Sequence, residues 1–131
     1  MNYSIDTTVK MNFDEAIAAT VEALMGEGFG VLTEIDLKKT FKTKLDVDFR
    51  NYRILGACNP HFAFEALAAE DKIGAMLPCN VIIQEHENGK VEVSAVNPMT
   101  PMQAAENPAL ADIASEVNEK LKRVISSLNR V

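Results

Sequence analysis

The first half of the chain shows two different periods of apolar residues. Residues 3–10 are apolar or β-branched at every second position, which is the period of a strand with one buried face. The segments 29–35 and 52–58 have the apolar composition of two further strands. Between the strands, apolar residues recur at steps of three and four, as on one side of a helix. Helices are therefore expected over 13–25, over 37–45 and from Pro60 onward.

Polar residues that cap helices stand directly before each of these helical segments. Asn12, with Glu15 three residues later, forms a capping box, and Asp36 precedes the short helix. Asn59 followed by Pro60 supplies an N-cap and a first-turn proline. The caps and the periodicity thus agree on where the three helices begin.

A turn signal divides two strand-like segments in the second half. Asn88 and Gly89 are the preferred pair for a two-residue turn, so 80–87 and 90–97 are expected to form a hairpin. Counting outward from that turn places Glu85 opposite Glu92 near the turn, where solvent screens the two carboxylates and weakens any acid/base role. The same register gathers one mostly apolar face, made of Ile82, Val91, Val93 and Ala95.

The last part of the chain is predicted to contain two helices, the second with a long apolar stripe. A capping box is expected over Thr100–Gln103, and Asn107 with Pro108 opens a helix whose apolar residues recur to Leu128. The whole order of elements favours an α+β fold in one domain spanning 1–131. We expect a mainly antiparallel, curved sheet of about five strands with helices packed on one face.

Composition and net charge exclude some classes of binding partner. Hydrophobic residues make up 47% and charged residues 24%, which is ordinary for a globular domain. The net charge of −6 has the wrong sign for binding nucleic acid or an anionic membrane by bulk electrostatics. There is no signal-peptide pattern, and no apolar stretch approaches the roughly 20 residues that span a bilayer. A soluble, cytoplasmic protein without nucleic-acid or membrane partners is expected.

One segment departs from the acidic average. Six of the thirteen basic residues lie within 38–53, where they could hold an anionic ligand or an acidic partner. Three aspartates in or beside the same segment favour the simpler interpretation of a solvated surface. The basic residues are Lys38, Lys39, Lys42, Lys44, Arg50 and Arg53.

The two cysteines are expected to be reduced thiols. Cys58 stands directly before Asn59, so the first amides of the following helix favour its thiolate form. Apolar burial acts in the opposite direction, because free cysteine is among the most buried residue types. A reactive thiol and a packed structural thiol are therefore both open interpretations. A disulfide between Cys58 and Cys79 would need Cα atoms within about 7 Å.

A metal site is not expected, although Cys58 and His61 have the spacing of half a zinc site. Cys79 and His86 are seven residues apart in one extended strand, about 23 Å at 3.3 Å per residue, and on opposite faces. They cannot share one ion, and no cofactor motif is present. Met99 and Met102 flank Thr100-Pro101 in an expected loop and short helix, where such soft side chains can line a binding surface.

Two segments of the chain resemble a known family. Tyr-Arg-Ile-Leu-Gly-Ala-Cys-Asn-Pro at 52–60 and Leu-Pro-Cys-Asn-Val at 77–81 are similar to the two signatures of domain-of-unknown-function family 302. The similarity extends over nearly the whole chain, with Arg50-Asn51 where members often carry a proline before the tyrosine. The resemblance implies a fold like that of the TATA-binding protein, and a homodimer. It implies no reaction, since the family is named for lacking one.

These observations favour a non-enzymatic module, of a small bacterial type, that binds a small ligand or a protein partner. The alternative is a thiol-dependent redox sensor or enzyme that uses Cys58. A sheet covered on one side only leaves its other face, or an edge strand, for a second copy of the chain. The candidate functional residues are Cys58, Asn59, His61, Cys79 and Asn80.

Overall fold

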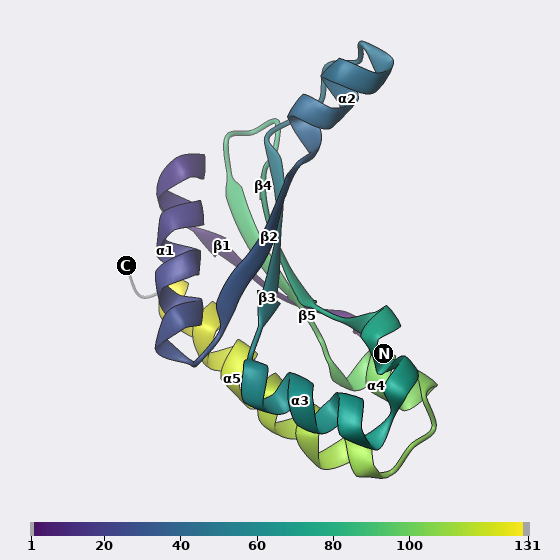
Figure 1. The fold of residues 1–131 in the computed structure, drawn as a ribbon. Helices are drawn as coiled ribbons and strands as arrows, with labels where there is room; N and C mark the ends of the chain where they lie inside the picture. Colours follow the sequence, from purple (N-terminus) through teal and green to yellow (C-terminus); the bar gives the residue numbers. More distant parts are fainter. Residues whose placement is uncertain (1, 130–131) are drawn as a thin grey trace.

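Five strands form one antiparallel sheet in the order β1-β5-β4-β3-β2 (Figure 1). The sequence predicts an antiparallel sheet of about five strands, but not this order. This computed structural model describes residues 2–129. The strands are β1 (Ser4–Val9), β2 (Gly30–Asp36), β3 (Tyr52–Cys58), β4 (Cys79–Glu85) and β5 (Val91–Val96). The helices are α1 (Phe13–Gly26), α2 (Leu37–Leu45), α3 (Pro60–Ala69), the 3-10 helix η1 (Asp71–Met76), α4 (Met99–Ala104) and α5 (Ala109–Leu128).

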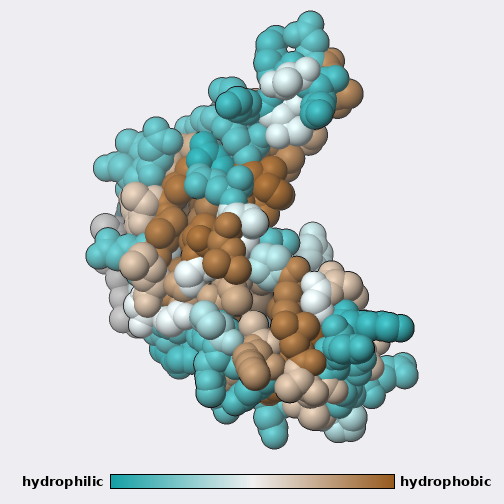
Figure 2. All heavy atoms as spheres, viewed as in Figure 1, coloured by the Kyte–Doolittle hydropathy of each residue, from teal (hydrophilic) through white to brown (hydrophobic). Residues whose placement is uncertain are grey.

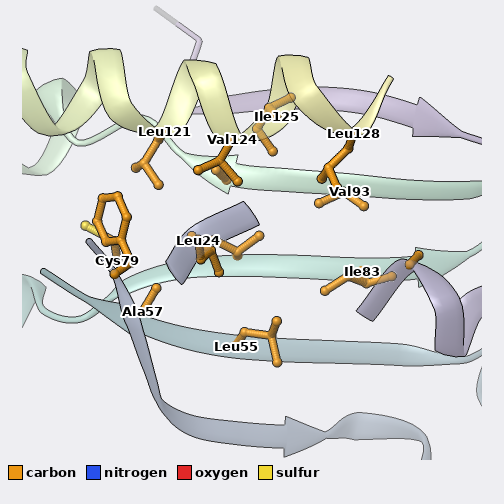
Figure 3. Packing of buried hydrophobic residues seen from close by; sticks show 14 of the residues in the cluster. Leu24, Leu55, Ala57, Cys79, Ile83, Val93, Leu121, Val124, Ile125 and Leu128 are labelled. Carbon is orange, nitrogen blue, oxygen red and sulfur yellow. The ribbon is translucent and has the colours of Figure 1, made fainter. Parts of the chain in front are cut away.

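The main core lies between one face of the sheet and the two long helices α1 and α5. The apolar stripe of α5, which includes Leu121 and Val124, points at the sheet in Figure 3, where Leu128 lies beside Val93. Leu121 and Leu55 are fully buried. The opposite face of the sheet carries no helix and is called the open face below. Ile54, Ile82, Gln84 and Ser94 lie on it, and the last two are buried.

The predicted helix starts are confirmed in part. The Asn12 side chain accepts a hydrogen bond from the Glu15 amide at 2.8 Å, and the Glu15 carboxylate accepts one from the Asn12 amide at 3.1 Å, which completes the capping box. Asp36 accepts from the Lys39 amide at 3.0 Å. The capping box expected over Thr100–Gln103 is wrong, because α4 begins at Met99, whose amide donates to the side chain of Asn97 at 3.0 Å.

The register expected for the hairpin is wrong by one residue. His86 and Lys90 are hydrogen bonded at 2.8 Å, so three residues rather than two form the loop, with Gly89 at φ +84°. This is a turn followed by a bulge glycine, the second common use of an Asn-Gly pair. A one-residue shift exchanges the faces of a strand, so Ile82 lies on the open face and Glu92 pairs with Gln84 instead of Glu85.

The connection between β2 and β3 projects from the sheet and is called the α2 arm, residues 37–50 (Figure 1). Its helix, α2, contains no buried residue. Phe41 and Phe49 meet edge to face, with ring centroids 5.0 Å apart, and Phe49 also lies beside Tyr52 of β3. These ring contacts attach the arm to the sheet. Within residues 2–129, no helix combines the length and the apolar character needed to cross a bilayer.

Candidate functional site

A cavity of about 300 Å³ opens between α3 and the end of the sheet where β3 finishes and β4 begins. We call it the α3 pocket. Its walls come from five parts of the chain that are far apart in sequence. They are Phe29, Leu32, Thr33, Ala57, Cys58, Asn59, Phe62, Ala63, Ala66, Leu67, Leu77, Pro78, Cys79, Pro98, Met102, Ile113, Ala114 and Val117.

The α3 pocket lies where two hydrophobic clusters meet without merging. Phe29, Ala57 and Val117 belong to the main core, whereas Ala66 and Ala114 belong to a smaller cluster under α3, η1 and α4. The walls that face each other at this seam include four alanines and two cysteines, whose side chains are too short to fill it. Close packing normally removes voids of this size, so a cavity lined by small apolar groups is a feature to explain.

The rim of the pocket is also apolar. Leu32 stands at an irregularity of the β2 edge strand and is 68% exposed, and Leu67 of α3 is 43% exposed. Both residues line the pocket. Figure 2 shows hydrophobic atoms on both sides of the hollow that separates the α2 arm from the part of the molecule built around α3. An opening with an apolar rim admits an apolar molecule without charged obstacles.

Three of the five residues singled out from the sequence line this pocket: Cys58, Asn59 and Cys79. Cys79 pairs with Ala57 across β3 and β4, which brings the two cysteines to the same end of the sheet. Because neighbouring residues of a strand point to opposite faces, Cys58 and Cys79 leave the sheet on different sides. Both thiols are free. Side chains that point apart cannot be bridged without moving the backbone.

The two thiols differ in burial. Cys79 is buried, and burial together with repulsion from Cys58 raises the pKa of its thiol to about 11. It is therefore protonated, and a poor nucleophile, at neutral pH. Cys58 is half-buried. Of the two thiols, Cys58 is therefore the one that could react at this pocket.

Asn59 has a different role from the helix cap that the sequence predicts. Its side chain makes no capping hydrogen bond; instead its amide Nδ2 donates to the carbonyl oxygen of Glu27 at 3.3 Å. It also lies 3.1 Å from the position that a Cβ would take at Gly28, where φ is +86°. Asn59 thus joins the start of α3 to the turn before Phe29, and so holds two walls of the pocket together.

The structure places the other two candidates outside the pocket. His61 lies on the outer side of α3, with its side chain 76% exposed and its imidazole 3.1 Å from the Glu65 carboxylate. Asn80 is exposed on the open face of β4. No group of three or more histidine, cysteine or acidic side chains suited to a metal ion occurs within residues 2–129. His61 and Cys58 therefore do not converge on one site.

Sequence reasoning missed most of the pocket because its walls are ordinary core residues. Met102 is an exception, because it was singled out with Met99 as a binding-surface candidate and lines the cavity, whereas Met99 does not. The alanines at 57, 63, 66 and 114 gave no signal. Each fits a helix or a strand equally well, and only the assembled fold shows that they face one another.

Comparison with known proteins agrees with this fold. The crystal structure of an uncharacterized conserved protein DUF302 from Bacillus stearothermophilus is similar to this chain, with a TM-score of 0.91. Their sequences are 27% identical, over 98% of this chain and 100% of that chain. No curated protein shows significant sequence similarity. The family described as "Domain of unknown function DUF302" matches residues 5–128. The chain therefore belongs to that family.

Proposed function

We propose that this chain is a non-enzymatic binding module that holds a neutral, apolar small molecule in the α3 pocket. The observation that carries the proposal is the chemistry of the walls. Apart from the two thiols, only Thr33 and Asn59 contribute polar side chains, and no charged residue lines the cavity. A charged ligand would lose its hydration there and gain no partner, which costs free energy.

The volume of the pocket limits the size of the ligand. An engineered apolar cavity of about 150 Å³ in another protein stays dry and binds benzene. A cavity of about 300 Å³ therefore accommodates two fused rings or a short branched chain. This volume is at the lower end of the range for small-molecule sites. Longer ligands would extend past Leu32 and Leu67 into the hollow.

A neutral fluorescent probe, N-phenyl-1-naphthylamine, tests the proposal. Ala63 lines the pocket on α3, so Ala63→Phe fills part of the cavity, whereas Ala68 is exposed on the same helix and outside it. Ala68→Phe is therefore a matched control. We expect saturable probe binding by the wild type and by Ala68→Phe, and at least tenfold weaker binding by Ala63→Phe. Equal binding by all three folded proteins, or none by the wild type, would refute the proposal.

The charge of the ligand gives a second comparison. At pH 7.5, 2-methylnaphthalene is neutral and 2-naphthoate is an anion of similar size. Because no basic side chain lines the pocket, 2-methylnaphthalene should displace the probe at a lower concentration. Stronger displacement by the anion would place the ligand at a basic surface instead.

The thiol-dependent alternative rests on Cys58, which lines the pocket as a free, half-buried thiol. A thiol enzyme or sensor needs a neighbouring base, a cation or a helix N-terminus to activate the sulfur. The start of α3, two residues after Cys58, offers the last of these. Within residues 2–129, no histidine or charged side chain lines the pocket with Cys58. A binding module should keep its affinity for the probe in Cys58→Ser. A thiol-dependent protein should lose its ligand response.

A further inference from the structure

The α2 arm carries an apolar side that its own chain leaves exposed. Leu45 is 65% exposed and Val47 is 48% exposed, and α2 buries no residue at all. A nine-residue helix is marginal in water when it stands alone, so packing against another surface would stabilise it. Phe41 lies one turn before Leu45 on the same face of α2 and contacts Phe49, but these ring contacts leave Leu45 and Val47 largely exposed.

The α2 arm also differs from the rest of the molecule in charge. The α2 arm, residues 37–50, contains five basic and two acidic side chains, a net charge of +3 in a chain whose total is −6. The segments 59–78 and 97–116 contain six acidic and one basic side chain, a net charge of −5. These two segments form α3, η1, α4 and the start of α5, and are called the α3 lobe. The α3 lobe supplies most walls of the pocket.

The arm and the α3 lobe stand at opposite ends of one hollow in Figures 1 and 2. A second copy turned by a two-fold rotation about the middle of the open face would place each arm on the other copy's lobe. Such an isologous contact is self-complementary, because the α2 arm of each copy meets the α3 lobe of the other. Opposite net charges attract across it, and exposed apolar residues meet at both ends.

We infer that two copies of this chain clasp each other in this way, with the arm of one copy covering the α3 pocket of the other. Leu45 and Val47 of the arm then pack near Leu32 and Leu67 at the rim, while the lysines of α2 face the acidic lobe. The pocket is closed on its open side only in the dimer. The inference extends the proposed function, since a ligand in the pocket would be enclosed by the second copy.

Charge reversal at each surface tests the clasp. Lys38, Lys39 and Lys44 are exposed on the arm and make no ion pair with their own chain within residues 2–129. An arm variant therefore carries Lys38→Glu, Lys39→Glu and Lys44→Glu. The lobe variant replaces three exposed acids: Glu65→Lys, Asp71→Lys and Glu106→Lys.

The readout is molecular mass by light scattering at low salt, after circular dichroism has shown that each variant is folded. The wild type should have about twice the monomer mass of 14.4 kDa. Each variant alone should stay near 14.4 kDa, because its arm and lobe now carry the same sign. An equal mixture should again give the dimer mass, since a reversed arm fits a reversed lobe and a native arm fits a native lobe.

Three outcomes would overturn the clasp: a wild type that remains monomeric up to about 1 mM, variants that still dimerise alone, or a mixture that does not recover the dimer. The probe experiment separates this failure from failure of the proposed function. A monomeric wild type whose probe binding is weakened by Ala63→Phe refutes the clasp and leaves the pocket as the ligand site. If the clasp covers the pocket, the monomeric arm variant should release the probe faster than the dimeric wild type.

Discussion

Single residues decide the chemistry of the α3 pocket. Cys79 is buried with a raised pKa of about 11, whereas Cys58, one strand away, is half-buried. The expectation from sequence that a cysteine stands at a strand end before a helix is confirmed for Cys58. Its accessibility relative to Cys79 depends on which face each side chain takes, and that follows from the pairing of β3 with β4.

Alkylation should separate the two thiols. In Cys79→Ser, the remaining Cys58 should react with iodoacetamide under native conditions. In Cys58→Ser, the remaining Cys79 should react slowly at pH 8 and faster only at more alkaline pH, because burial, the larger cause of its raised pKa, is unchanged. Mass spectrometry of timed samples measures both rates. Equal rates at pH 8 would show that Cys79 is not buried as described.

Gly56 tests the packing of the strand end beside the pocket. A Cβ at this position would lie 2.1 Å from Oγ1 of Thr33 and 2.8 Å from Cγ of Pro78. Gly56→Ala should therefore lower the free energy of unfolding by about 1–3 kcal/mol. Gly26→Ala is the control, since nothing lies within 4 Å of its Cβ position, and it should be neutral or slightly stabilising. Matching urea midpoints for the two variants would contradict this packing.

At the scale of elements, the sequence predicted every strand and the starts of α1, α2, α3 and α5, whereas η1 was not predicted and the start of α4 was misplaced. Period, capping residues and turn signals are local, and they agree with one another through the first half of the chain. The hairpin register failed because Asn88 and Gly89 suit both a two-residue and a three-residue loop. The side of the sheet that each residue takes depends on that choice, so the predicted position of Ile82 failed with it.

An ion pair between elements gives a pH-dependent prediction. Glu27, at the end of α1, accepts hydrogen bonds from Arg123 of α5 at 3.0 and 3.2 Å. The hydrogen bond from Arg123, opposed by desolvation and aided by the charges of Arg123 and Lys120, holds the pKa of Glu27 below its usual value of 4.5. Its contribution to stability is therefore present above pH 4.5 and is lost as the pH falls through the lower folded value.

Glu27→Gln should consequently lower the urea midpoint at pH 7, and the difference from the wild type should shrink as the pH falls below 4.5. The exposed Glu22 lies on the same helix, so Glu22→Gln serves as the control and should show little change. A difference that stays constant from pH 7 to pH 3 would mean that Glu27 acts through packing rather than through its charge.

At the scale of the whole molecule, the sequence predicted the layers but not the cavity. A mainly antiparallel sheet with helices on one side follows from the apolar faces of the elements, and the structure confirms both features. The order of the strands was not predicted. A cavity depends on which small side chains face one another across distant segments. Local sequence patterns do not predict these contacts. The basic segment was visible in the sequence, whereas its projection as an arm was not.

The most direct test of the account is an NMR titration of ¹⁵N-labelled protein with N-phenyl-1-naphthylamine. Saturable shifts should concentrate at amides around the α3 pocket, such as Cys58, Phe62 and Val117, and be weakened in Ala63→Phe. The hairpin loop at Asn88 should stay unchanged. Shifts that avoid the pocket walls, or that gather on the α2 arm and the hairpin alone, would contradict the claim that this cavity binds the ligand.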